Sequence, residues 1–214
     1  MRKTKERTRP HRFYYFWVRQ TAILLLLYSR TRVKVIGKEL LDPKKRYMVI
    51  SNHISTFDPI VAMAKLGLDP LICVSKKENF NIPICGPFIH HAGFIELDRT
   101  NNRSAIRMIN RACSDLEKDL ASIYICPEGT RSKTGELLPF HPGSFKIATR
   151  ANVPIVICHI ENTHLIAKHF PFRGTKTKLE IVKVISIEEI QKLTTAELAD
   201  MAYNILLKKK ENEQ

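Results

Sequence analysis

Two residues that could transfer a proton stand five positions apart in the segment Ser51-Asn52-His53-Ile54-Ser55-Thr56-Phe57-Asp58-Pro59. Five positions on a regular helix place side chains about 140° apart, so a continuous helix could not pair them. A loop that leaves a strand and enters a helix could bring the two side chains together. Asp58 would then hold one imidazole nitrogen of His53, and the other would accept a proton from a substrate hydroxyl. The plainer alternative is a strand-end histidine beside an aspartate that caps a helix.

Two arginines follow predicted strands elsewhere in the chain. Arg99 ends the segment Gly93-Phe94-Ile95-Glu96-Leu97-Asp98-Arg99, and Arg131 lies in the turn Pro127-Glu128-Gly129-Thr130-Arg131-Ser132. Two arginines at strand ends could hold one phosphate group bidentately. The nucleotide motifs GxxxxGK[ST] and GxGxxG do not occur. For either arginine alone, a surface salt bridge is the plainer interpretation.

Neither a metal site nor a disulfide framework is predicted. The cysteines are odd in number, form no CxxC pair and mostly neighbour apolar residues, which favours free thiols in a reducing compartment. The adjacent His90 and His91 have no carboxylate or cysteine at ligand spacing. The five cysteines are Cys73, Cys85, Cys113, Cys126 and Cys158.

Strand and helix signals alternate along the chain after residue 32. Asp58 and Pro59 are typical of a helix N-terminus, Gly67 of its end, and Thr194 with Glu197 of a capping box that opens the last helix. Residues 102–120 show helical apolar spacing. This alternation predicts an α/β fold with a mainly parallel sheet flanked by helices, in one domain over 33–214. The predicted strands are 33–36, 47–50, 71–74, 94–97, 123–126, 154–160 and 178–185.

Residues 1–32 form a distinct basic and apolar segment. The apolar run 13–28 would span ~24 Å as a helix, short of a ~30 Å hydrocarbon core, and Arg19 interrupts it. An aromatic cluster at 13–17 suits the membrane interface, so we expect a membrane-anchoring helix that lies in the interface or is partly inserted. The alternatives are a buried first helix behind a basic tail, or a full span. The preceding basic residues are Arg2, Lys3, Lys5, Arg7, Arg9 and Arg12.

Composition limits the classes of protein that fit. A chain of 214 residues with 44% hydrophobic residues suits one packed domain and is not a wholly disordered polymer. Charged residues at 26% exclude a polytopic membrane protein. The 35 Lys and Arg against 21 Asp and Glu give a net charge of +14. This excess predicts an anionic partner, either nucleic acid, an anionic membrane surface or a phosphorylated substrate.

Four blocks in order resemble the glycerophospholipid acyltransferase superfamily, most closely the lysophosphatidic acid acyltransferases. They cover about residues 35–160, and the block at 127–132 is the most specific. Cys126 departs from the phenylalanine that commonly precedes this block, and Cys158 departs from the usual aliphatic residue or proline. The blocks are Asn52-His53-x4-Asp58; Lys76-Lys77-Glu78 with Gly93-Phe94-Ile95-x-x-Asp98-Arg99; Pro127-Glu128-Gly129-Thr130-Arg131-Ser132; and Val153-Pro154-Ile155-Val156.

The resemblance implies an acyl transfer reaction at the predicted pair. His53 would be the general base for the sn-2 hydroxyl of 1-acylglycerol-3-phosphate, and Asp58 would orient it and balance its charge. The activated oxygen would attack acyl-CoA or acyl-acyl carrier protein and form phosphatidic acid. Lysophosphatidic acid and an acyl thioester are then the expected partners, with acyl carrier protein as one donor, and neither a bound cofactor nor a metal is expected.

The same resemblance assigns the remaining residues of the site. Arg99 and Arg131 would hold the phosphate, with Lys76 nearby. The apolar segment 80–89 could line a tunnel for the acyl chain or could be ordinary core. Residues that would shape the site are Asn52, Glu128, Gly129 and Thr130.

Three alternatives remain open. The same fold could act on another acceptor, such as glycerol-3-phosphate, another lysophospholipid or a lyso-aminolipid. A basic nucleic-acid-binding protein would explain the charge, but recognisable nucleic-acid-binding motifs do not occur. A noncatalytic membrane-surface protein would not need His53 and Asp58. We therefore expect a membrane-associated enzyme on the cytoplasmic face, the inner membrane in a bacterium, that binds no nucleic acid.

Overall fold

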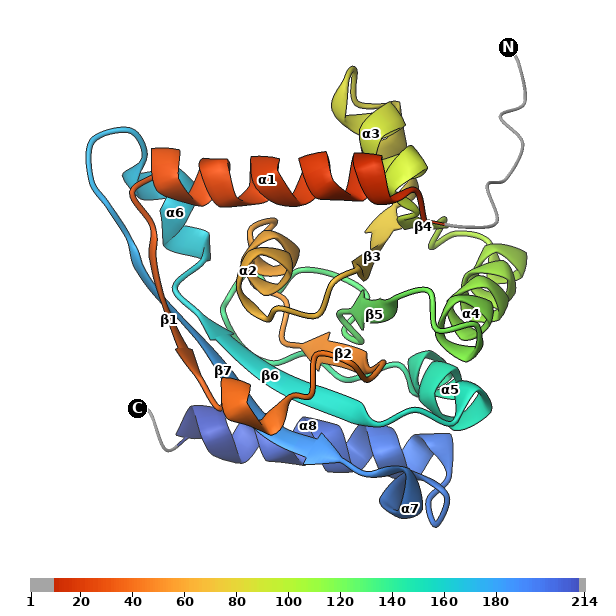
Figure 1. The fold of residues 1–214 in the computed structure, drawn as a ribbon. Helices are drawn as coiled ribbons and strands as arrows, with labels where there is room; N and C mark the ends of the chain where they lie inside the picture. The colour runs from red at the N-terminus through yellow and green to blue at the C-terminus, as the bar shows by residue number, and fades with distance from the viewer. Residues whose placement is uncertain (1–9, 212–214) are drawn as a thin grey trace.

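The computed structural model describes residues 10–211, which form a seven-stranded sheet with helices on both faces (Figure 1). The basic stretch at positions 2–9 lies outside the described residues. The strand order is β1-β7-β6-β2-β5-β3-β4, and every neighbouring pair is parallel except β6 with β7. The prediction of a mainly parallel sheet is confirmed. The strands are β1 (Arg32–Ile36), β2 (Met48–Ser51), β3 (Leu71–Lys76), β4 (Ile95–Leu97), β5 (Ser122–Ile125), β6 (Ile155–Glu161) and β7 (Lys176–Ile185).

The central strands are apolar because both of their faces are covered. Every residue of β2 and β5 is buried, and so are the first six residues of β6. Continuous rather than alternating apolar runs are typical of parallel strands between two helical layers. The antiparallel β7 instead alternates buried and less buried positions near the edge of the sheet. The core of the molecule therefore lies along β2, β5 and β6.

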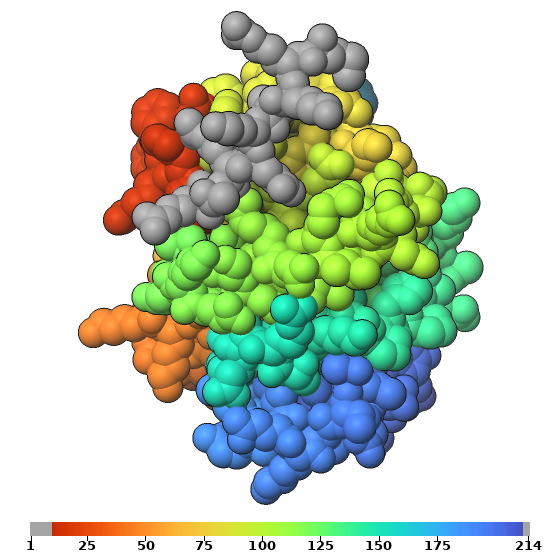
Figure 2. Space-filling view, turned by 90° about the vertical axis from the view of Figure 1, so that its right-hand side faces the viewer, coloured from red at the N-terminus to blue at the C-terminus, as the bar shows by residue number. Residues whose placement is uncertain are grey.

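The helices cover both faces of the sheet. Helices α1 and α2 lie over one face and α8 over the other, while α4 and α5 lie side by side on the flank seen in Figure 2. The chain moves one way along the sheet through α2 and returns through α4 and α5, and the usual right-handed crossover places helices of opposite direction on opposite faces of a sheet. The helices are α1 (Arg12–Tyr28), α2 (Asp58–Lys65), α3 (Cys85–Ala92), α4 (Asn102–Glu117), α5 (Pro142–Ala151), α6 (His164–His169), α7 (Ile187–Ile190) and α8 (Thr195–Glu211).

Local end signals predicted some of these helices and missed others. Gly67 adopts a φ of 78° just after α2, as a helix-ending glycine does. The capping box before α8 is present, with the Thr194 N–H donating to Glu197 at 2.7 Å and the Glu197 N–H donating to Thr194 at 3.3 Å. Helices α3, α5, α6 and α7 were not predicted, because they are short and lack extended helical periodicity.

Helix α1 packs one face against the domain and leaves the other in solvent. Tyr15, Ala22 and Leu26 are buried. The Tyr15 hydroxyl donates to Asp69 at 2.8 Å and accepts from the Leu71 N–H at 3.0 Å, so α1 is tied to the start of β3. Within residues 10–211, none of the helices combines the length and the apolar character needed to cross a membrane. The exposed face carries Phe13, Phe16, Trp17, Leu24, Leu27 and Tyr28.

Candidate active site

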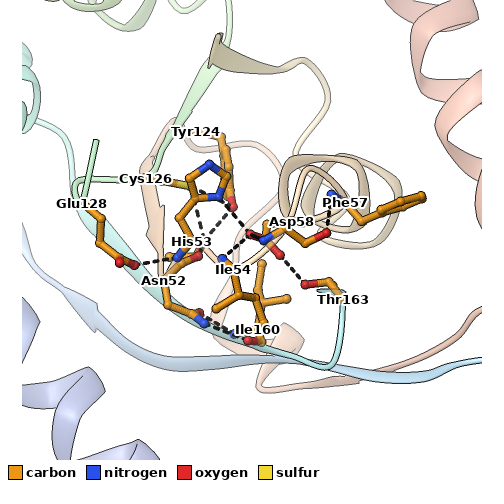
Figure 3. A network of polar contacts seen from close by, with 12 residues as sticks. Asn52, His53, Ile54, Phe57, Asp58, Tyr124, Cys126, Glu128, Ile160 and Thr163 are labelled. Atoms are coloured by element: carbon orange, nitrogen blue, oxygen red, sulfur yellow. Dashed lines mark hydrogen bonds and ion pairs between the residues drawn. The ribbon is translucent and has the colours of Figure 1, made fainter. Parts of the chain in front are cut away.

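The structure brings His53 and Asp58 together at the end of β2. His53 lies in the short loop after this strand, and Asp58 is the first residue of α2. The Nδ1 atom of His53 lies 2.9 Å from Oδ2 of Asp58 (Figure 3). The loop between them reverses the chain, which a continuous helix could not do. Asp58 therefore uses Nδ1 of His53, and Nε2 is the ring nitrogen left for other chemistry.

Asp58 is fully buried and surrounded by hydrogen-bond donors. Its Oδ2 accepts from the N–H groups of Ile54 and Ser55, both at 2.8 Å, as well as from His53. Its Oδ1 accepts from the Thr163 hydroxyl. Four donors around one side chain match an ionised carboxylate, which only accepts hydrogen bonds. The prediction that Asp58 caps α2 is wrong, because the N-cap residue is Phe57 and the carboxylate turns back to the loop.

The turn 127–132 holds the backbone of His53 from the other side. The Glu128 carboxylate accepts from the His53 N–H at 2.6 Å (Figure 3). It also accepts from the Leu138 N–H at 3.0 Å. The Ser132 N–H donates to the His53 carbonyl at 2.8 Å. Burial raises the pKa of Glu128 to about 6, although these N–H donors act in the opposite direction. Glu128 thus fixes the position of the histidine backbone.

The environment of His53 favours the protonated imidazole. Burial lowers its pKa, but the hydrogen bond to Asp58 and the neighbouring sulfur of Cys126 outweigh burial and raise the pKa to about 10. The neutral form that can accept a proton therefore becomes more abundant as the pH rises above neutrality. A histidine whose pKa is strongly shifted by a buried partner and that lies in a cleft is a candidate catalytic residue.

Asn52 and Gly129 act on the shape of the site. The Asn52 amide donates to the Ile160 carbonyl and accepts from the Ile160 N–H, both at 2.8 Å, so it ties the end of β2 to β6. Gly129 has a φ of 66°, and a Cβ there would lie 2.9 Å from the His141 ring. Thr130 lies beside it on the wall of the cleft. Asn52 and Gly129 therefore support the geometry of the loops beside His53, and Thr130 lines the cleft.

His53 opens into a cleft of about 670 Å³ that also contains the three predicted phosphate ligands. Lys76 ends β3, Arg99 follows β4 and Arg131 follows β5, and these parallel strands end at the same edge of the sheet. Lys76 pairs with Glu78 at 3.2 Å. Among the described residues, no carboxylate lies within ion-pair distance of Arg99 or Arg131. The surface salt bridge suggested as the plainer role for these arginines is therefore not observed.

The rest of the cleft wall combines helix N-termini with apolar side chains. Asn102 and Pro142, the first residues of α4 and α5, both border the cleft, and helix N-termini favour anions. The segment 80–89 does not line this cleft, and its Ile82, Ile84 and Phe88 are exposed. The apolar lining comes instead from Val74, Leu97, Ala105, Met108 and Ile109.

Within residues 10–211, the structure contains no group of three or more His, Cys, Asp or Glu side chains that could hold a metal ion. The expectation that the chain needs neither a metal nor a bound cofactor remains a prediction. The cleft therefore offers an imidazole that can transfer a proton and cationic side chains that can bind an anionic group.

Comparison with known proteins decides the family. The family model described as Acyltransferase matches residues 32–161, which is more than half of the chain. The chain belongs to the Acyltransferase family. The matched span contains all nine residues predicted from the sequence for the site, from Asn52 to Arg131. Thr163, which contacts Asp58, lies just beyond it.

The sequence of this acyltransferase chain is similar to those of known acyltransferases. It is 34% identical over 172 residues to the 1-acyl-sn-glycerol-3-phosphate acyltransferase of Saccharomyces cerevisiae, with 78% of this chain and 56% of that protein covered. It is 36% identical over 143 residues to the protein of the same name from Limnanthes douglasii, with 66% and 49% covered. The chain thus spans about half the length of these relatives.

A solved structure shares the fold of this acyltransferase chain. It is the 1-acyl-sn-glycerophosphate (LPA) acyltransferase PlsC of Thermotoga maritima. The TM-score is 0.68 and the identity 22%, with 89% of this chain and 78% of that chain covered. At this identity the likeness establishes the α/β architecture alone.

Sequence reasoning missed three side chains around the pair. Thr163 is separated from Asp58 by 105 residues, so spacing could not reveal it. Cys126 was noted only as a departure from the family pattern, yet it lies beside His53 in the cleft. Tyr124 is fully buried, and its hydroxyl lies 2.6 Å from the Ser51 hydroxyl, which donates to the Asn52 carbonyl. The only early signal was that Tyr124 and Cys126 end a predicted strand.

Proposed function

We propose that this acyltransferase moves a fatty acyl group from an acyl thioester to the sn-2 hydroxyl of 1-acylglycerol-3-phosphate and forms phosphatidic acid. The observation that carries the proposal is that the His53–Asp58 pair and three cations, Lys76, Arg99 and Arg131, share one cleft. The names of the relatives in yeast and Limnanthes support the same substrate class.

The reaction follows from the position of the pair. Neutral His53 accepts the proton of the sn-2 hydroxyl while the hydroxyl oxygen attacks the carbonyl carbon of the thioester. The carbon–sulfur bond of the tetrahedral intermediate then breaks, and the imidazolium returns the proton to the leaving thiolate. Asp58 holds Nδ1 throughout, so it fixes the ring and stabilises the positive charge that appears on it. The acyl group passes directly between the substrates.

The cations select the acceptor. A phosphate monoester carries up to two negative charges, and the guanidinium groups of Arg99 and Arg131 match its geometry. The acyl chains would lie along the apolar residues of the cleft, where burial stabilises them by about 0.8 kcal/mol for each methylene. Glycerol-3-phosphate shares the phosphate but lacks the acyl chain, and other lysophospholipids carry a diester, so both are weaker candidates. The donor is acyl-CoA or acyl-acyl carrier protein.

The membrane partner is an anionic surface at the cytoplasmic face. The outer face of α1 exposes Phe13, Trp17 and Leu27 to solvent, and an aromatic and aliphatic face of this kind suits the bilayer interface. The apolar surface continues at both ends of the helix: Tyr14 contacts Phe88 at 5.6 Å between ring centres, and Tyr28 contacts Phe170 at 5.1 Å. A lipid acceptor and a lipid product both favour this location.

A direct assay tests the proposal. The purified protein is incubated with radiolabelled acyl-CoA and, separately, with lysophosphatidic acid, glycerol-3-phosphate, lysophosphatidylcholine and lysophosphatidylethanolamine. We expect label in phosphatidic acid, at a rate well above that with the other acceptors and about 10²–10⁴-fold lower with the His53→Ala variant. Preferred labelling of a diester product would contradict the acceptor assignment, and no transfer to any acceptor from either acyl-CoA or acyl-acyl carrier protein would contradict the reaction.

A further inference from the structure

Thr163 contacts the buried side of the His53–Asp58 pair. It lies in the turn between β6 and α6, its side chain is fully buried, and its hydroxyl donates to Oδ1 of Asp58 (Figure 3). It makes no contribution to the wall of the cleft, so a bound substrate would not touch it. Any influence of Thr163 on the reaction must therefore pass through Asp58.

The Thr163 hydroxyl does not cap the helix that follows it. Thr163 is the N-cap residue of α6, where a threonine side chain usually accepts from a backbone N–H of the first turn. Here Thr163 makes no such bond, and its hydroxyl turns toward Asp58 instead. The turn is held in place from both sides. Asn162 adopts a left-handed φ of 62°, and Ile160 is bound to the Asn52 side chain.

The two oxygens of Asp58 have different partners. Oδ2 receives three N–H groups, from His53, Ile54 and Ser55. Within the described residues, Oδ1 receives only the Thr163 hydroxyl. A carboxylate turns about its Cβ–Cγ bond in a broad energy well, so the donor on Oδ1 narrows the range of planes that the three donors on Oδ2 allow. That plane sets the angle at which Oδ2 faces Nδ1 of His53, while the N–H groups on Oδ2 keep the two atoms in contact.

We propose that Thr163 is a positioning residue for the acyl transfer reaction, because its hydroxyl fixes the Asp58 carboxylate that orients and charge-balances His53. The inference deepens the proposed function and rests on it for the reaction, but not for the hydrogen-bonded geometry. Removing the hydroxyl should leave substrate binding intact, since Thr163 lies behind the pair and outside the cleft.

The hydroxyl also moderates the charge that His53 experiences. A donor to Oδ1 draws negative charge away from Oδ2, so its loss makes the carboxylate a stronger partner for the imidazolium. The pKa of His53 should then rise further. Cys126 and Tyr124 lie near His53 at the end of β5 and Glu128 lies in the following turn, while Lys76, Arg99, Arg131 and His141 share the cleft with His53. Among the described residues, the structure shows no bond from Thr163 to any of these groups.

The test compares Thr163→Val, which has nearly the same shape without the hydroxyl, with Thr163→Ser, which keeps it. Thr177→Val is the matched control, because Thr177 is also buried and its hydroxyl has no hydrogen-bond partner among the described residues. Two readouts are used. One is the imidazole titration of His53 by NMR without substrate, assigned by the signal missing in His53→Ala. The other is kcat and KM for lysophosphatidic acid and the acyl donor across pH.

We expect Thr163→Val to lower kcat at neutral pH about tenfold, the scale of one hydrogen bond to a charged group, with both KM values unchanged. Its His53 titration and the rising limb of its pH–rate profile should both move to higher pH by ~0.5 unit or more. Thr163→Ser should restore both properties, and Thr177→Val should resemble the unmodified chain.

Three results would overturn the inference. The first is an unchanged His53 titration in folded Thr163→Val, whatever its rate. The second is an increase in KM in place of a decrease in kcat. The third is failure of both Thr163→Val and Thr163→Ala to fold while Thr163→Ser folds, since the hydroxyl would then serve the fold itself. Because the NMR titration needs no turnover, it also separates failure of this inference from failure of the proposed function.

Discussion

The Nδ1 atom of His53 lies 2.9 Å from Oδ2 of Asp58 although a continuous helix would hold the two side chains apart. The contact exists because β2 ends at Ser51 and α2 begins at Asp58, so the residues between them form a reversing loop. The N–H groups of Ile54 and Ser55 in this loop donate to the same carboxylate oxygen. The backbone therefore builds the environment of Asp58 as the chain turns.

Removing either member of this pair should reduce acyl transfer and leave the fold intact. His53→Ala should lower kcat about 10²–10⁴-fold, the usual contribution of a general base. Asp58→Asn should also lower it strongly, because an amide cannot balance the imidazolium charge. His164→Ala is the control, since this histidine is exposed and outside the cleft. Steady-state kinetics with circular dichroism check the prediction, and normal turnover in His53→Ala would exclude His53 as the base.

The pH dependence should follow the titration of His53. Its pKa in the folded protein is raised to about 10, so kcat/KM should increase with pH from 6 to 9.5 as the neutral imidazole accumulates. Asp58→Asn removes the main group that raises this pKa, and the rising limb should move toward the ordinary histidine value near 6.5. Initial rates are corrected for spontaneous thioester hydrolysis. A bell-shaped profile centred near neutrality in the unmodified chain would contradict the assignment.

The same titration affects stability in a defined direction. The folded-state pKa of His53 lies above its unfolded value, so the bond to Asp58 stabilises the fold fully below about pH 6.5. This contribution is lost as the pH rises through the folded-state value. The difference in melting temperature between the unmodified chain and His53→Ala should therefore shrink on the alkaline side, which thermal denaturation in a buffer series can measure.

The parts of this site that were predictable from sequence are those close together in the chain. The segment 52–58 and the turn 127–132 each carry several functional residues within a short span, so their motifs were visible. The parallel sheet then explains why Arg99 and Arg131, from separate segments, meet at one edge. Thr163 could not be found in this way, because its role depends on the register of β6 against β2 and on the turn that follows.

Fold prediction had a similar limit. Strands were predictable because β2, β5 and β6 are apolar runs buried on both faces. The antiparallel direction of β7 was not, since parallel and antiparallel partners present similar residues to a neighbour. Asp58 pairs with His53 as expected, but it was wrongly expected to cap α2, because an aspartate before a proline has the same sequence signature whether it caps the helix or binds the preceding loop.

Substitution of the arginines should affect the acceptor more than the donor. Arg131→Ala should raise KM for lysophosphatidic acid about tenfold or more, and Arg99→Ala by a smaller factor, because each loses a charge-assisted hydrogen bond to phosphate. Arg131→Lys should rescue only in part, since an ammonium cannot form the bidentate pair. Lys133→Ala is a control, because this exposed cation lies two residues away and outside the cleft. A change confined to KM for the acyl donor would assign both arginines to the donor instead.

Gly129 and Gly135 allow backbone strain to be separated from a steric clash. Both have positive φ, 66° and 82°, so alanine at either should cost ~1–2 kcal/mol in conformational strain. A Cβ at Gly129 would also meet the His141 ring at 2.9 Å, whereas Gly135 has open space. Gly129→Ala should therefore lower both stability and kcat more than Gly135→Ala does. Urea denaturation and kinetics of the two variants check this, and equal effects would mean that the clash is relieved without disturbing the turn.

The exposed face of α1 supplies the last prediction. Trp17→Ala, Leu24→Ser and Leu27→Ser together remove apolar groups from this face, while the buried residues Tyr15, Ala22 and Leu26 stay in place. The melting temperature should hardly change, because the altered side chains are 47–66% exposed and the buried face of the helix is unchanged. Ile106→Ser is the matched control, since Ile106 is 59% exposed but lies on α4.

Cosedimentation with phosphatidylglycerol vesicles at low and high salt measures the outcome. Apolar insertion does not depend on salt, whereas attraction between basic residues and anionic lipid is screened within about 10 Å at 0.1 M salt. The triple variant should therefore bind less tightly than the unmodified chain by tenfold or more in 0.5 M salt, since each methylene withdrawn from lipid costs about 0.8 kcal/mol. Ile106→Ser should bind normally. Activity on lysophosphatidic acid in vesicles should fall more than activity on the same acceptor in detergent. Unchanged sedimentation of the triple variant at high salt would show that another surface holds the protein on the membrane.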